Sequence, residues 1–138
     1  MKTSKLYRWA VVLTLLALVA EFVLGMYTAL FVEFPSTLEQ GNAWMFAFTN
    51  SPVIAAHIYL GTFLILAGLI TFALGIAEKR RSAVITSGLG LLLMFAAWWS
   101  GGLFLGNVEV NTYSFSMALT FLGSLLSYCA ALYYARAT

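Results

Sequence analysis

Four apolar runs, each long enough to cross a bilayer as a helix, are the feature that most constrains the fold of this chain. They extend over residues 9–31, 52–77, 83–105 and 112–134. A transmembrane helix needs about 20 mostly apolar residues, and hydrocarbon offers no hydrogen-bond partners to an unpaired backbone. Only 9% of the 138 residues are charged, too few to cover a water-soluble domain. The sequence therefore predicts an all-α membrane protein, an up-down antiparallel four-helix transmembrane bundle forming one domain over residues 1–138.

Basic residues flank these runs on one side only of a four-pass arrangement. They are Lys2, Lys5, Arg8, Lys79, Arg80, Arg81 and Arg136, whereas the other side carries only Glu33, Glu39 and Glu109. The positive-inside rule then predicts a multi-pass protein of the cell membrane with both termini cytoplasmic. The net charge of +2 belongs to these flanks and indicates no nucleic-acid partner. We expect the first run to be a retained anchor, because it continues past Glu21 and has the large Leu18 where signal cleavage needs a small residue.

The connections between the runs differ in length. Residues 78–82 predict a tight turn between the second and third runs, and residues 106–111 predict another between the third and fourth. The first connection, residues 33–51, is long and carries the aromatic residues Trp44 and Phe48. Aromatic side chains are typical of the membrane interface. We therefore expect this connection to lie across one end of the bundle as a short amphipathic segment.

His57 is the only histidine of the chain, and it lies in the second run, which has no charged residue. A polar, titratable side chain in hydrocarbon costs free energy unless something there uses it. Neutral imidazole is a good ligand of haem iron, and the alternative is a structural hydrogen bond to a carbonyl or hydroxyl. Gly61, Gly68 and Gly75 follow at seven-residue spacing. Such a stripe allows close helix packing, or it offers the flat face that a porphyrin needs.

Glu21 is the second polar residue in an unexpected place, near the middle of the first run. An intramembrane acid can relay protons or hydrogen-bond a quinol or a partner subunit, or it can be neutral and bonded within its own protein. On a rise of about 1.5 Å per residue, Glu21 lies about 7 Å deeper than His57, so their contact stays open. Trp98 and Trp99, in the third run, either wall a cofactor or quinone pocket or contact lipid and neighbouring helices.

Each of the four runs carries a short motif. The second has the HxxxG of His57 and Gly61, and the first, third and fourth have residues 24–28 (LGMYT), 100–102 (SGG) and 117–121 (MALTF), respectively. These motifs resemble segments of the four transmembrane helices in each half of the haem A synthase family, whose halves have cytoplasmic termini and haem ligands near the outer face. Four-helix b-type cytochromes share much of this pattern. The resemblance implies a membrane protein that binds heme b, with His57 as iron ligand, in electron transfer or beside respiratory-complex subunits.

The chain departs from the family at several points. Thr120 stands where the second histidine ligand occurs, and residues 54–56 (IAA) stand where the catalytic acid occurs. The paired cysteines of the first outer loop are also missing. Catalytic haem A synthesis is therefore doubtful. If haem is bound, the sixth ligand is Met117, a histidine from a second copy in a homo-oligomer, or absent, and Met117 is otherwise a packing residue.

The residue types exclude several other functions. One histidine and no aspartate leave no nucleophile–base–acid constellation, no Cys/His zinc spacing and no phosphate-binding loop. The alternative to a haem protein is a cofactor-free accessory subunit of a larger membrane complex. A small transporter built around Glu21 is a third interpretation.

Overall fold

Five helices make up the part of the chain that the computed structural model describes, residues 2–34, 42–106 and 111–136. They are α1 (Lys2–Phe31), α2 (Asn42–Thr49), α3 (Pro52–Ala77), α4 (Arg81–Gly106) and α5 (Asn111–Arg136). No strand occurs in these residues. The four long helices are each long and apolar enough to cross a membrane, which confirms the predicted all-α class and the four candidate spans.

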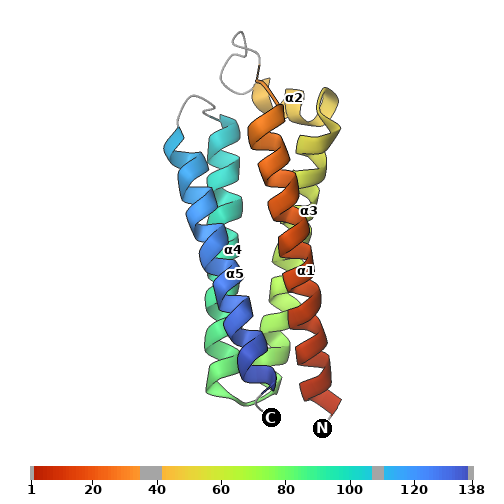
Figure 1. Ribbon diagram of the computed structural model, residues 1–138, viewed down its shortest axis with the longest axis vertical. Coiled ribbons are helices and arrows are strands. Elements are labelled where there is room, and N and C mark those ends of the chain that lie inside the picture. The colour runs from red at the N-terminus through yellow and green to blue at the C-terminus, as the bar shows by residue number, and fades with distance from the viewer. Residues whose placement is uncertain (1, 35–41, 107–110, 137–138) are drawn as a thin grey trace.

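The four long helices lie side by side, and both chain termini are at the same end (Figure 1). α1 packs against α3 and α5, and α4 packs against the same two helices. Consequently α1 and α4 occupy opposite corners of the bundle, as do α3 and α5. The short α2 packs against α3 and α4 at the end away from the termini (Figure 1). This helix forms part of the connection predicted over residues 33–51, of which residues 35–41 lie outside the described part of the chain.

Buried residues recur at alternating steps of three and four along the long helices. In α1 they are Tyr7, Val11, Thr14, Leu18 and Glu21, and in α4 they include Ala83, Ser87, Gly90, Met94 and Ala97. A seven-residue repeat keeps one face of a helix against its neighbours when helices wrap with a left-handed twist, and membrane bundles use this packing widely. The remaining faces carry large exposed apolar side chains, as a surface in contact with lipid requires.

The sequence explains where α3 begins and ends. Ser51 precedes the helix, and its Oγ accepts a hydrogen bond from the Ile54 backbone N–H at 3.4 Å, while Pro52 occupies the first turn, where no backbone donor is needed. At the other end, the Glu78 N–H donates to the Leu74 carbonyl at 3.0 Å. Lys79 follows with φ 55°, a left-handed conformation that reverses the chain. The predicted tight turn before α4 is confirmed.

Side-chain hydrogen bonds join neighbouring helices within the apolar core. The hydroxyls of Thr14 on α1 and Thr71 on α3 lie 3.0 Å apart, and Thr71 also donates to the Ala67 carbonyl at 2.8 Å. Because Thr71 uses its hydrogen for Ala67, Thr14 is the donor to Thr71. This bond links α1 to α3 within the apolar core.

The substitution Thr14→Val is expected to lower the free energy of unfolding by about 0.5–1.5 kcal/mol. Valine keeps the shape of threonine but cannot donate to Thr71, whose own bond to Ala67 persists and limits the loss. Unfolding by sodium dodecyl sulfate in mixed micelles measures the change. Thr112→Val, at an exposed position of α5, is the control, and equal losses in both variants would contradict a specific role for the Thr14–Thr71 bond.

Candidate functional site

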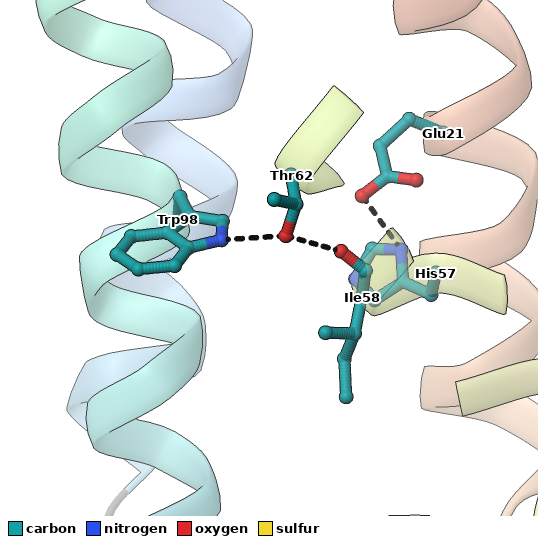
Figure 2. Close-up of polar contacts among 5 residues, drawn as sticks. All are labelled: Glu21, His57, Ile58, Thr62 and Trp98. Carbon is teal, nitrogen blue, oxygen red and sulfur yellow. Dashed lines mark hydrogen bonds and ion pairs between the residues drawn. The ribbon is translucent and has the colours of Figure 1, made fainter. Parts of the chain in front are cut away.

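Glu21 and His57 lie in contact between α1 and α3 (Figure 2). His57 Nδ1 is 3.0 Å from Glu21 Oε1, and the two side chains are 20% and 8% exposed, respectively. The two atoms are within ion-pair distance, but their contact does not have the geometry of a directed hydrogen bond. The structure thus brings together the two polar residues whose contact the sequence left open.

Each member of the pair occupies space that a glycine on the opposite helix leaves free. A methyl group on Gly61 would lie 2.8 Å from Glu21 Oε1, and one on Gly25 would lie 3.1 Å from His57 Cε1. The first distance is shorter than real side-chain contacts and the second is tight. The two helices therefore interlock through the same spacing, ExxxG in α1 (Glu21 and Gly25) and HxxxG in α3 (His57 and Gly61).

The two nitrogens of the His57 ring are in different surroundings. The Cε1 atom of the ring points at Gly25. Both ring nitrogens are 3.8 Å from the position of a Gly25 Cβ, so one nitrogen lies on each side of Cε1 and they face in different directions. Nδ1 faces Glu21, and Nε2 faces away from it. Among the described residues, nothing makes a hydrogen bond or ion pair with Nε2. An imidazole oriented at one nitrogen by a carboxylate and free at the other is the arrangement of a metal-ligating histidine.

The donor set distinguishes between kinds of metal. Within the described ranges, no group of three or more His, Cys, Asp and Glu side chains could hold a metal ion. A bare ion such as zinc needs three or four protein ligands. Haem iron takes its equatorial ligands from the porphyrin and needs only one or two axial ligands from the protein. A single imidazole such as that of His57 meets the axial requirement of haem iron but supplies only one of the three or four ligands that a bare ion needs.

Trp98 lies on the side of His57 that faces α4, but its indole binds a neighbour rather than lining an open space. Its Nε1 donates to Thr62 Oγ1 at 3.1 Å, and Thr62 donates to the Ile58 carbonyl at 2.8 Å (Figure 2). This chain of hydrogen bonds ties α4 to α3 one turn beyond His57. The geometry thus shows a helix-linking bond for Trp98.

Met117 and Thr120 lie on α5, in the corner opposite α3. Met117 Sδ packs against α4, where a methyl on Gly101 would lie 3.1 Å from it. The Thr120 hydroxyl is 2.8 Å from the Ser116 carbonyl of its own helix, the usual partner of a threonine within a helix. Met117 therefore belongs to the α4–α5 contact, and the Thr120 hydroxyl is used within its own helix.

Side chains cover the glycine stripe of α3 beyond Gly61. The Tyr128 hydroxyl lies 3.2 Å from the position of a Gly68 Cβ, and Ser87 Oγ lies 2.7 Å from that of Gly75. The stripe therefore receives side chains from other helices along its length. It does not present the flat, open face that the porphyrin interpretation of these glycines requires.

Tyr128 is a buried polar residue that the sequence analysis missed. It is the largest fully buried side chain, and its ring lies so close to Gly90 that a methyl there would be 2.6 Å from Cε2. Its hydroxyl has no hydrogen-bond partner in the described part of the chain. No signal within its own segment predicts this burial, which depends on Gly90 and Gly68 on other helices.

Comparison of the chain with protein-family models, with curated proteins and with solved structures found no match. The contacts of Glu21 and His57 are therefore the basis for a functional interpretation.

Proposed function

We propose that the protein is a membrane protein that binds a b-type haem through His57 Nε2. The observation that carries this proposal is the oriented imidazole: Nδ1 lies 3.0 Å from Glu21 Oε1, and Nε2 has no partner among the described residues. The motifs that resemble haem A synthase helices add support. Bound haem supplies one-electron chemistry, which suits electron transfer within or beside a respiratory complex.

The chain's own residues have distinct roles in this proposal. The Glu21 carboxylate faces Nδ1. Its charge would favour a proton on that nitrogen, and the lone pair of Nε2 would then be available to a haem iron. Gly25 leaves space beside the ring edge, and Gly61 leaves space for the carboxylate. Glu21 is in this view a positioning residue that acts through His57.

The proposed arrangement in the membrane is up-down, with both termini in the cytoplasm. The basic side chains Lys5, Arg8, Lys79, Arg80 and Arg81 are exposed and belong to the segments at the end that carries the termini (Figure 1). The positive-inside rule favours the cytoplasm for that end. The Glu21–His57 pair then lies in the outer half of the bilayer, since His57 is in the first two turns of α3.

The expected result of the decisive experiment is a haem spectrum that depends on His57. The protein, purified in mild detergent, should show a Soret band, and its reduced-minus-oxidised spectrum and pyridine haemochrome should be those of b-type haem. His57→Ala should abolish these bands, because the iron loses its protein ligand. Tyr59→Phe, an exposed position of the same helix, is the control and should keep them. An unchanged Soret band in folded His57→Ala protein would overturn the proposal.

A cofactor-free accessory subunit is the second candidate function. The observation that favours it is the covered glycine stripe, together with the contacts of Met117 and Thr120 on the far side of the bundle. In that case Glu21 and His57 stabilise the α1–α3 interface and nothing else. A protein that stays colourless after addition of haem and copurifies with larger membrane proteins would support this function.

A further inference from the structure

A small pocket lies at the end of the bundle that carries both termini, away from the Glu21–His57 pair. Residues of α1, of the α3–α4 turn, of the start of α4 and of α5 line it, among them Tyr7, Glu78, Arg80, Ser82 and Tyr134. Its enclosed space is about that of one water molecule. Because α3 ends and α4 begins at this level, the pocket lies where a spanning bundle meets the lipid headgroups.

Two groups of opposite charge line this pocket without a partner of their own. Glu78 Oε1 is buried and has no hydrogen-bond partner in the described part of the chain. The Arg80 side chain is exposed, and across the described ranges it makes no ion pair. A buried carboxylate oxygen without a donor is unfavourable. The pocket therefore favours a ligand that brings a hydrogen-bond donor to Glu78 and an anionic group to Arg80.

We propose that this pocket binds the headgroup of an aminophospholipid, with its primary ammonium against Glu78 and its phosphate against Arg80. In an ethanolamine headgroup two carbon atoms separate these groups, so one molecule carries both charges that the pocket lacks. An ammonium group is about the size of a water molecule and fits the enclosed space. The trimethylammonium of a choline lipid is too large for it, and a glycerol headgroup has no cation.

The proposal is independent of haem, because the two sites use different residues at different ends of the bundle. Its specificity has a separate physical origin for each charge. Arg80 recognises the phosphate that all phospholipids share, and guanidinium groups suit phosphate oxygens well. Glu78 recognises the cation, so it decides between ethanolamine and other headgroups. Loss of Arg80 should therefore weaken binding of every phospholipid, whereas loss of Glu78 should remove the preference for ethanolamine.

Native mass spectrometry of the full chain, titrated with short-chain phosphatidylethanolamine, phosphatidylcholine and phosphatidylglycerol, tests this. We expect the ethanolamine lipid to bind the wild type most tightly. Each of Glu78→Gln and Arg80→Gln should weaken that binding by about tenfold, the usual effect of losing one charged hydrogen bond. Arg81→Gln removes the same charge next to Arg80 but from a residue that does not line the pocket. It should change binding by less than about twofold.

Three outcomes would overturn the proposal. Equal affinity for the ethanolamine and choline lipids would show that Glu78 does not recognise the primary ammonium group. Equal weakening by Arg81→Gln and Arg80→Gln would show a general attraction of phosphate to the basic end of the bundle. Binding of soluble phosphoethanolamine or inorganic phosphate as tightly as the lipid would assign the pocket to a free anion. Circular dichroism of each variant confirms that its helices are intact.

Discussion

Gly90→Ala is expected to lower the free energy of unfolding by about 2–3 kcal/mol, although alanine normally stabilises a helix relative to glycine. The added methyl would lie 2.6 Å from Cε2 and 2.9 Å from Cδ2 of Tyr128. These are atoms of a rigid ring that is fully buried, so the ring cannot rotate away into open space. Moving α4 away instead would break the 3.0 Å hydrogen bond from Ser124 Oγ to the Gly90 carbonyl.

Unfolding in mixed micelles measures this effect against a control in the same helix. A methyl on Gly102 would meet only Trp44 Cζ2, at an ordinary 3.8 Å. Gly102→Ala should therefore leave the free energy of unfolding unchanged or raise it by up to about 1 kcal/mol. In addition, Tyr128→Ala should cost less in the Gly90→Ala background than in the wild type, because in that background it also relieves the clash with the added methyl group. Changes of the same sign and size in the free energy of unfolding of Gly90→Ala and Gly102→Ala would contradict this packing.

Glu21→Ala is expected to lower the free energy of unfolding by about 2–4 kcal/mol. Alanine leaves His57 Nδ1 buried without its partner and leaves empty the space beside Gly61 that the carboxylate fills. Glu21→Gln keeps the shape of the side chain and an oxygen atom that faces His57 Nδ1. It should therefore cost less than about 1 kcal/mol.

Both variants need to be compared in the same cofactor state, since a ligand bound to the folded protein raises its stability. A double-mutant cycle with His57→Ala isolates the interaction of the pair, and the cost of Glu21→Ala should fall once His57 is absent. Glu33→Ala, at an exposed position, is the control for loss of a carboxylate. Independent effects of Glu21→Ala and His57→Ala would show that their contact does not stabilise the bundle.

Hydropathy predicted the spans well and the helix ends less well. The structure has α3 at the predicted bounds, because Pro52 and the polar turn after Ala77 mark the limits of both the apolar run and the helix. The first apolar run begins at residue 9, but α1 begins at Lys2. Basic residues are compatible with a helix in the polar interface, so the hydrocarbon boundary and the helix boundary differ there.

The candidate site could be predicted only in part, because contacts across helices depend on the register between them. Counting residues from the helix ends separates Glu21 and His57 by about one turn, yet the side chains meet because Gly25 and Gly61 leave room for them. Tyr128 is a stronger example. Its burial depends on Gly90 and Gly68 on two other helices, and nothing within its own segment shows this.

The interlocked pair has a consequence for how the protein is made. α1 leaves the ribosome before α3, and its Glu21 enters the bilayer before its partner His57, which follows 36 residues later in the chain. Until α3 arrives, the carboxyl group faces lipid or the insertion machinery, where an acidic side chain is costly. Docking of α3 then removes this penalty. It does so at only one register of α3 against α1, since Glu21 needs the space at Gly61 and His57 needs the space at Gly25. Membrane insertion of the first helix and assembly of the bundle are thereby linked events.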